Sequence, residues 1–308
     1  MQRNAIALMI TLMFIISITV AIGVGLKQIK DASNSVEDET FMIESSVIFD
    51  DVLRVLQTNK DLDLITKAET VEDKRDALAI FLAGSAFIPF ESSGVKVILE
   101  IKSARDRFNP NTLVDLNQTQ IDARVEILGN YFVNNGIESD FLGFLLDATS
   151  GIKDDGNYRS ELFIREPTLF RDYISSDKHF SKIKALYRDI YHTSSLEKVD
   201  FDKLFYFTPQ RDSAVDLNYA PLEVWKMMLG VESERAQQLV DAEGSYGSLE
   251  DLLLSDEEKL ALAKFKTSFY EPYIDVRVEI LKANKNVKIQ LEYDLTKKKG
   301  SHFIYELQ

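Results

Sequence analysis

The longest uninterrupted apolar run of the chain lies at its start, between Ala5 and Leu26, and its twenty-two residues include no charged side chain. As a helix this run would be about 33 Å long, because each residue adds about 1.5 Å, whereas the hydrocarbon core of a bilayer is about 30 Å thick. A secretory signal peptide has a shorter apolar core, followed by a cleavage site of small residues. We therefore expect a retained membrane helix, with a cleaved export signal as the alternative.

After this run the apolar positions recur at helical spacing. Between 41 and 56 they return every three to five residues, with acidic side chains among the intervening residues. This spacing gathers the apolar side chains on one face of a helix, which we predict from about 27 to 59. A second helix is predicted over 73–87, where either Gly84 or the approach of Pro89 ends it.

Strands are predicted where β-branched residues alternate with polar ones. The first is 95–101, and three more follow near the end of the chain at 273–281, 286–295 and 301–307. Short turns join the last three, which predicts an antiparallel meander. Because three strands alone are too small to be stable, we expect the meander to pair with 95–101 and to pack on the helix over 40–60.

Between the first strand and the meander the pattern changes to helix and loop over 115–266. Two helical periods in this region are each followed by a glycine, Gly136 and Gly151, which is typical of a helix end. The order of elements therefore predicts an α+β fold. In it, a helix packs on an antiparallel sheet, and a large all-helical segment is inserted between two strands.

Composition narrows the classes of function. The chain has 50 acidic and 36 basic residues, which gives a formal net charge of −14. Because phosphate contacts require a surplus of lysine and arginine, this charge argues against binding to nucleic acid or to anionic membranes. The absence of cysteine excludes disulfides and thiolate chemistry. His179, His192 and His302 are far apart in the sequence, so we expect surface or packing roles for them and no enzymatic activity.

Three sequence blocks resemble segments of one protein family in the same order. They are SSGVKVILEIKSARDRFNPNTL (92–113), FLGFLLDATSGIKDDGNYRSEL (141–162) and VDLNYAPLEVWKMMLGVESERAQQLVDAEGSYGSLEDLL (215–253). Together with the N-terminal apolar helix, they are similar to the minor pseudopilin K of type II secretion systems, also called general secretion pathway protein K. The order of the blocks, more than any one of them, carries the resemblance.

The resemblance implies a pilin-like N-terminal membrane helix and a spine helix packed on an antiparallel sheet, with a large all-helical insertion. It divides the chain into a short leader (1–5), a transmembrane helix (6–26), the first part of the pseudopilin domain (27–114), the helical insertion (115–266) and the C-terminal strands (267–308).

The resemblance also implies that a prepilin peptidase cleaves between Ala5 and Ile6. Ala5 stands where the family usually has glycine. Counted from Ile6, the fifth mature position is Ile10, where other pilin-type subunits have glutamate and this family does not. That carboxylate lets an incoming subunit capture the amine of one already placed, so a chain without it fits the tip of a filament, where an unpaired charge would only be a cost.

The implied role is that of a minor pseudopilin at the tip of the pseudopilus, which initiates pseudopilus assembly and supports protein export across the outer membrane. The implied partners are other minor pseudopilins, the prepilin peptidase and the inner membrane, with secreted substrate as a further candidate and no nucleic acid. The implied location is the inner membrane, crossed once, with the folded part in the periplasm.

The resemblance also raises a candidate calcium site, because some relatives carry calcium in the helical domain; no cofactor is required. Asp147, Asp154 and Asp155 could supply carboxylate oxygens, with loop carbonyls near Gly151 and Gly156. In this chain the family's tryptophan and second aspartate after Asp147 are missing. We therefore favour solvated turn residues, with calcium ligation as the alternative.

The 215–253 block also resembles a helix-hairpin-helix unit, which binds DNA phosphate through backbone N–H groups. This similarity supports an alternative function as a membrane-tethered DNA-uptake or competence protein. In the hairpin at 229–234 the second glycine is missing, and Glu232 and Glu234 stand where a phosphate would approach. We therefore favour structural packing of two short helices, with Trp225 as their core anchor.

Overall fold

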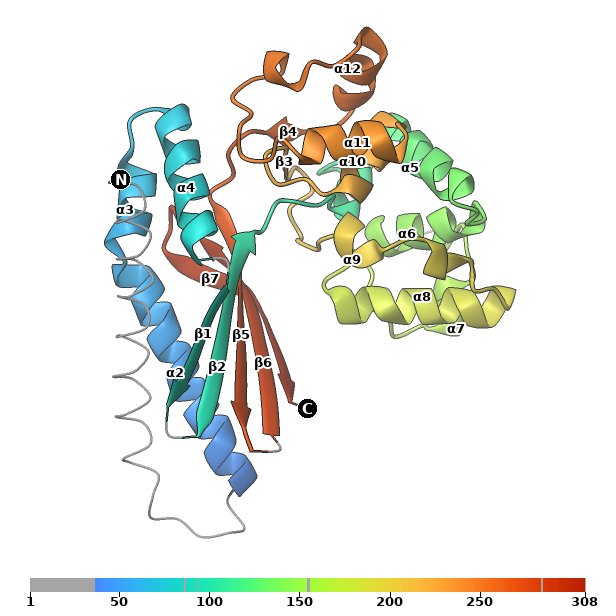
Figure 1. The fold of residues 1–308 in the computed structure, drawn as a ribbon. Helices are drawn as coiled ribbons and strands as arrows, with labels where there is room; N and C mark the ends of the chain where they lie inside the picture. The colour runs from blue at the N-terminus through green and yellow to red at the C-terminus, as the bar shows by residue number, and fades with distance from the viewer. Residues whose placement is uncertain (1–36, 86, 93, 154–155, 284, 308) are drawn as a thin grey trace. The chain divides into compact units, whose positions relative to one another are not determined.

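The computed structural model describes residues 37–307 except 86, 93, 154–155 and 284 (Figure 1). The described part of the chain forms two compact units, separated between Ala104 and Arg105 and again between Glu271 and Pro272. The sequence had suggested divisions after 114 and after 266. The expected membrane helix lies outside the described residues, and within 37–307 as described no helix is both long and apolar enough to cross a membrane.

The first unit combines the described residues up to Ala104 with those from Pro272 onward. Its elements are α2 (Glu37–Thr58), α3 (Lys60–Lys67), α4 (Val71–Ser85), β1 (Phe87–Ser92), β2 (Val95–Ser103), β5 (Tyr273–Lys282), β6 (Lys285–Asp294) and β7 (Lys299–Leu307).

Helix α2 ends at the expected place, but a further helix follows it that the sequence analysis missed. Asn59 is the N-cap of α3, and its side-chain oxygen accepts the N–H groups of Asp61 and Leu62 at 2.7 and 3.3 Å. Those two N–H groups have no partner inside the helix, so the cap begins α3 one residue after α2 stops.

The five strands of this unit form one antiparallel sheet in the order β1-β2-β5-β6-β7. Strand β1 was not expected, because 73–87 was assigned to a helix; α4 ends at Ser85 and the chain is extended from Phe87. Pro89 is compatible with β1 because this strand lies at the sheet edge. The chain between β2 and β5 forms the second unit, yet these two strands are direct neighbours, so the insertion leaves the sheet continuous.

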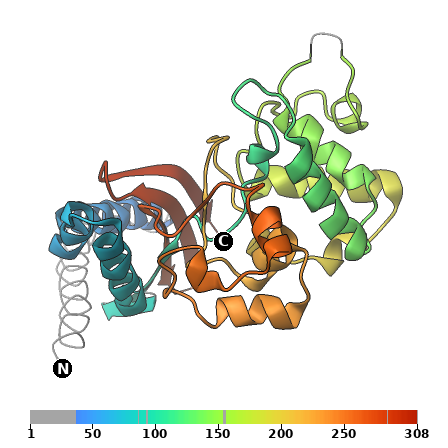
Figure 2. The same ribbon diagram turned by 90° about the horizontal axis from the view of Figure 1, so that it is seen from above.

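One face of the sheet is covered by helices and forms the core of the unit. Helix α2 contacts β6 and helix α4 contacts β2, and Figure 2 shows the helices gathered beside the sheet. Alternate strand residues therefore point into the core, and those of the two central strands are at most 1% exposed: Val97, Leu99, Ile101, Val276, Val278 and Ile280. The buried face of α2 supplies Phe41, Ile48, Val52 and Leu56.

The second unit is the helical insertion, Arg105–Glu271. Its elements are η1 (Pro110–Leu113), α5 (Asp122–Asn134), α6 (Asp140–Thr149), α7 (Leu162–Arg165), α8 (Asp177–Tyr191), η2 (Ser195–Lys198), α9 (Phe201–Leu204), β3 (Val215–Asp216), α10 (Leu222–Leu229), α11 (Ser233–Val240), η3 (Glu250–Leu252), α12 (Asp256–Leu262) and β4 (Thr267–Ser268).

The core of this unit is rich in aromatic rings. Phe201 lies 5.7 Å from Phe141 and 5.3 Å from Phe180 between ring centroids, in edge-to-face arrangements. The glycines after α5 and α6, Gly136 and Gly151, have positive φ angles of 69° and 76°, as the sequence predicted for helix ends. The expected α+β class is therefore confirmed: a helix packs on an antiparallel sheet, and an all-helical unit is inserted between two of its strands.

Candidate functional site

Helix α2 is held on the sheet by a partly buried ion pair. Nζ of Lys282 on β5 lies 2.8 and 2.7 Å from the two carboxylate oxygens of Glu44, a residue that is only 4% exposed. A buried carboxylate without a partner is costly, so this pair selects one rotation of α2 about its axis. The opposite face of α2, which includes Ile43, is thereby exposed.

A strip of apolar side chains lies where α2 meets the edge strand β7. The ring of Phe303 packs edge-on against that of Phe49, with centroids 5.9 Å apart, and the hydroxyl of Tyr305 lies 3.0 Å from the sulfur of Met42. Phe303 is nevertheless 55% exposed and Tyr305 is 41% exposed. We call these four residues the α2–β7 seam.

The α2–β7 seam combines two features of protein-binding surfaces. Its apolar side chains are only partly covered, and contiguous exposed apolar surface marks interaction sites. Among the described residues, β7 pairs with β6 on one side and with no strand on the other, so this second side is a strand edge that a partner can approach. The sequence pattern predicts both the helix and the strand, but it cannot predict the seam, because strand order decides which residues of α2 and β7 meet.

The expected peptidase site at Ala5 and Ile6 and the tip-type position Ile10 lie outside the described residues. Their proposed roles stay predictions.

Asp147, at the end of α6, is fully buried and is saturated by hydrogen-bond donors. Its Oδ1 accepts the backbone N–H of Arg159 at 2.9 Å, and its Oδ2 accepts both the N–H and the hydroxyl of Ser160 at 2.7 Å. Nζ of Lys153 lies 3.6 Å from Oδ1. A calcium ligand must turn its oxygen lone pairs toward the cation. The lone pairs of Asp147 are instead directed at Arg159 and Ser160, so Asp147 fits the role of a residue that fixes this loop on the end of α6.

Asp154 and Asp155, the other two residues of the candidate calcium site, lie outside the described residues. Among the residues that are described, no group of three or more histidine or acidic side chains is placed to hold a metal ion. The calcium site as a whole stays a prediction.

Two asparagines of the 92–113 block connect distant loops of the helical unit. The amide of Asn109 donates to the carbonyls of Thr208 and Gln210 at 3.1 and 2.9 Å. Asn111 donates to the carbonyl of Ile174 at 3.0 Å and accepts its N–H at 2.7 Å. Both asparagines are at most 1% exposed. Buried backbone groups must be paired, and this need accounts for asparagine at both positions without any binding role.

Asn218 plays the same part in the 215–253 block. Its amide donates to the carbonyls of Tyr246 and Phe269, both at 2.8 Å, and its oxygen accepts the N–H of Tyr246 at 2.8 Å. Trp225 is fully buried on α10 and lies edge-on to Tyr246 with centroids 6.5 Å apart. The expected role of Trp225 as a core anchor is confirmed.

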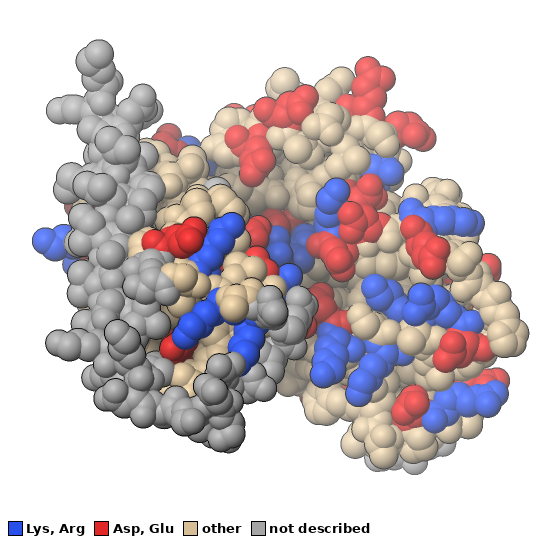
Figure 3. Space-filling model, turned by 60° about the horizontal axis from the view of Figure 1, so that its bottom comes forward, with Lys and Arg blue, Asp and Glu red and all other residues tan. Residues whose placement is uncertain are grey.

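The helix pair of this block has the expected hairpin form. Helix α10 ends at Leu229 with Gly230 as its C-cap, whose φ is 66°, and α11 begins at Ser233 with Glu232 as its N-cap. Glu232 and Glu234 are exposed at this N-terminus, where a phosphate would need the backbone N–H groups. On the molecular face drawn in Figure 3, basic and acidic side chains of the described residues are interspersed and form no continuous basic surface.

Asp216 is a buried acid that no sequence motif revealed. Its oxygens accept the N–H of Asn218 at 3.1 Å and the N–H of Glu271 at 3.2 Å, and its own N–H donates to the carbonyl of Arg105 at 2.7 Å. Burial raises the pKa of Asp216 to about 7, although the two N–H donors act in the opposite direction.

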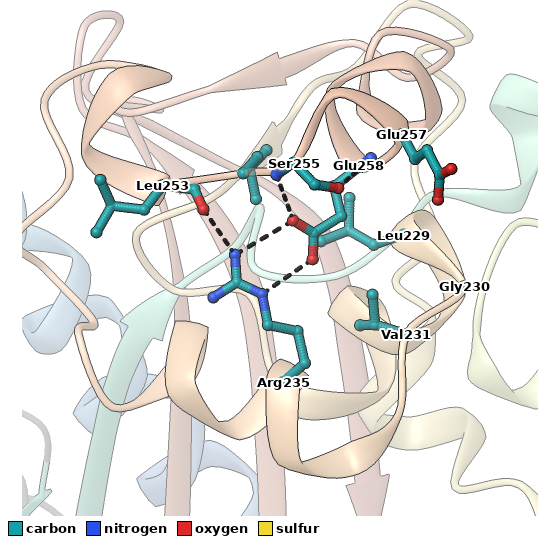
Figure 4. Close-up of a pocket in the computed structure, with 9 residues that line it drawn as sticks. Leu229, Gly230, Val231, Arg235, Leu253, Ser255, Glu257 and Glu258 are labelled. Carbon is teal, nitrogen blue, oxygen red and sulfur yellow. Dashed lines mark hydrogen bonds and ion pairs between the residues drawn. The ribbon is translucent and has the colours of Figure 1, made fainter.

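A groove of about 650 Å³ lies between the α10–α11 hairpin and the segment from η3 to α12 (Figure 4). Beside it, Nε of Arg235 lies 2.9 Å from Oε1 of Glu258, and Nη2 of Arg235 lies 3.0 Å from the carbonyl oxygen of Leu253. Ser255 and Glu258 form a capping box at the start of α12. The S-x-x-E spacing was a usable sequence signal for this helix start, but it does not reveal the groove.

The three histidines lie in packing, helix-capping and surface positions. His179 is 7% exposed and its Nδ1 accepts the N–H of Ser175 at 3.2 Å, while burial lowers its pKa. His192 is the left-handed C-cap of α8. His302 is exposed on β7. The expectation that the protein is not an enzyme stays a prediction.

A solved structure resembles this fold over most of the chain. A chain of the crystal structure of the GspK-GspI-GspJ complex from the type 2 secretion system of enterotoxigenic Escherichia coli aligns with a TM-score of 0.61. The alignment covers 88% of this protein and 99% of that chain, at 11% sequence identity. No protein-family model and no curated protein matches the sequence. The fold is therefore pseudopilin-like.

Proposed function

We propose that this protein is a minor pseudopilin of a type II secretion system. The observation that carries the proposal is the insertion of a complete helical unit between the neighbouring strands β2 and β5 of a helix-covered antiparallel sheet. This architecture aligns with nearly all of a chain from a pseudopilin complex. The three sequence blocks that resemble pseudopilin K, in their family order, support the same assignment independently.

In this function the chain does no chemistry and acts through assembly. The apolar helix at 6–26 anchors the protein in the inner membrane, with the folded part in the periplasm, and the prepilin peptidase cleaves after Ala5. The α2–β7 seam contacts other minor pseudopilins. Because Ile10 leaves no carboxylate for a preceding subunit's amine, the chain occupies the pseudopilus tip and initiates assembly.

The test is joint expression of the full chain with the minor pseudopilins encoded in the same genome, followed by purification from membranes in mild detergent. We expect a stoichiometric complex that contains this chain, and loss of protein secretion in a strain that lacks it. Assembly of the other minor pseudopilins and normal secretion, both without this chain, would contradict the proposal.

Mass spectrometry of the membrane protein tests the N-terminal part of the proposal. We expect loss of the first five residues in cells with an active prepilin peptidase. Recovery of only the uncleaved chain would count against the peptidase assignment, and loss of the whole apolar segment would identify an export signal.

The DNA-uptake alternative has one structural feature in its favour, the α10–Gly230–α11 hairpin. Its electrostatics oppose that role, because Glu232 and Glu234 flank the N–H groups that would bind phosphate. A mobility shift of duplex DNA by the full chain, weakening as salt is raised, would support the alternative over our proposal.

A further inference from the structure

The groove between the α10–α11 hairpin and the η3–α12 segment is lined by both apolar and charged side chains. Leu229, Val231 and Leu254 line it, and Gly230 leaves part of the wall without a side chain. Leu253 stands at the rim and is 82% exposed. Figure 4 shows the ion pair of Arg235 and Glu258 between Leu253 on one side and Leu229 and Val231 on the other.

The surroundings of the groove are strongly acidic. Residues 222–262, from α10 to α12, include ten acidic side chains and three basic ones, Lys226, Arg235 and Lys259. That arginine already donates to both carboxylate oxygens of Glu258, at 2.9 and 3.3 Å, and to the carbonyl of Leu253. Lys226 and Lys259 pair with acids of their own helices, Glu223 and Asp256, at 3.9 and 3.5 Å. The three basic side chains therefore have acidic partners, while exposed acids such as Glu257 and Glu232 leave the region with a net negative charge.

We propose that this groove binds a segment of another protein in which one or two large apolar side chains are flanked by lysine or arginine. The apolar side chains would cover Val231 and Leu253 and remove them from water. The flanking cations would lie near Glu257 and Glu232, where unlike charges attract. Anionic partners, including nucleic acid and acidic lipid surfaces, are repelled by the same side chains.

A second copy of this chain is a poorer occupant, because it would bring the same negative charge to the interface. The net charge of −14 makes such a self-contact unfavourable unless basic residues are concentrated at the docking segment. This inference concerns the helical unit and does not rest on the proposed secretion function.

The test measures peptide binding to the full chain in nanodiscs of zwitterionic lipid. The probe is a fluorescein-labelled peptide, Gly-Lys-Lys-Leu-Leu-Lys-Lys-Gly, followed by fluorescence anisotropy with empty nanodiscs as the blank. Two comparison peptides replace the leucines by serine or the lysines by glutamate. We expect binding of the first peptide only, with affinity that falls as salt screens the charges.

Protein variants separate the groove from the general negative charge. Leu253→Asn removes the apolar rim and Glu257→Lys reverses a rim charge, and each should weaken binding about tenfold, the loss expected from one buried leucine or one close charge pair. Leu116→Asn and Glu166→Lys make the same changes at exposed positions outside the groove and should leave binding unchanged. Melting temperatures confirm that each variant is folded.

Three results would overturn the inference. They are the absence of binding to the unaltered chain, equal binding of the serine peptide, and equal weakening by the groove variants and their controls. The last two would identify attraction to the overall negative charge alone.

Discussion

Asp216 accepts the backbone N–H of Glu271 through its carboxylate, with Oδ2 and the nitrogen 3.2 Å apart. The N–H of Asp216 itself donates to the carbonyl of Arg105. Arg105 begins the helical unit after β2, and Glu271 ends it before β5. One buried residue therefore ties together the two chain segments through which the insertion is connected, which fixes the closure of the helical unit.

We expect this carboxyl group to make stability depend on pH. Its pKa is about 7 in the folded protein, against 3.8 for an ordinary aspartate. The folded protein thus favours the protonated acid. The contribution of Asp216 to the free energy of unfolding is therefore fully present below about pH 4 and is lost as pH rises through 7. The shift corresponds to at most about 4 kcal/mol. Thermal melts between pH 5 and 8 should show a declining melting temperature.

Asp216→Asn should flatten that decline, because an amide does not titrate in this range. The matched control is Asp212→Asn, at a carboxylate that is 67% exposed, and it should keep the pH dependence of the unaltered protein. An unchanged slope in Asp216→Asn would show that other groups cause the decline.

At acid pH we expect stability to change in the opposite direction, because hydrogen bonds from Ser195 and Tyr187 lower the pKa of Glu138. The contribution of Glu138 to the free energy of unfolding is lost as pH falls through that lowered pKa.

The α2–β7 seam predicts an asymmetry between the two edges of the sheet. Phe303 on β7 is 55% exposed and Phe87 on β1 is 62% exposed, so replacing either by aspartate removes a similar exposed ring. Phe303→Asp should abolish co-purification with the other minor pseudopilins, since it places a charge in the seam. Phe87→Asp should leave co-purification intact. Equal behaviour of the two variants would show that the seam is not the assembly contact.

Asn218 offers a test of whether the 215–253 block is structural. Asn218→Asp changes one atom, but it points a carboxylate oxygen at the carbonyls of Tyr246 and Phe269 in place of an N–H donor. We expect a loss of about 3 kcal/mol or more in the free energy of unfolding, because a buried charge would face two acceptors. Denaturant unfolding measures it, and Asn117→Asp at an exposed turn should cost less than about 0.5 kcal/mol.

Most of the fold could be predicted from local patterns in the sequence. The period of α2 and the alternation in β2, β5, β6 and β7 were sufficient to predict a helix on an antiparallel sheet with a helical insertion. Strand β1 was missed because FLAGSAF reads as a continued helix, and only pairing with β2 holds Phe87 and its neighbours extended. Helix α3 was missed because the chain breaks at Asn59 between two helices, and this break leaves no gap in the helical spacing of the apolar residues.

The candidate sites were less accessible to sequence reasoning because they depend on contacts between distant segments. Nothing in the sequence around Asp216 distinguishes it from other aspartates, because its burial depends on Arg105 and Glu271, which are distant in the chain. The groove needs Val231 from the hairpin and Leu253 from the η3 segment to come together. In contrast, the acidic character of 222–262 was visible in the sequence, where it served only to argue against DNA.

Leu253 is held in a backbone conformation that is unfavourable for leucine, and this allows a prediction that separates stability from binding. It is the C-cap of η3 with a φ of 48°, and its side chain is 82% exposed. The left-handed region costs a non-glycine residue about 1 kcal/mol, and asparagine tolerates it better than leucine. The hydrogen bond from Arg235 is made to the carbonyl of Leu253, so it does not depend on the side chain.

Leu253→Asn should therefore raise the free energy of unfolding by about 0.5 kcal/mol and the melting temperature by about 1–2 °C. The adjacent Leu252 is the matched control. It is 1% exposed, and Leu252→Asn should cost about 3 kcal/mol or more, because it buries an amide in an apolar site. A melting temperature lowered by several degrees in Leu253→Asn would show that its side chain stabilises the fold. A stable variant that binds the basic peptide about tenfold more weakly would instead show that this exposed leucine acts in binding and does not stabilise the core.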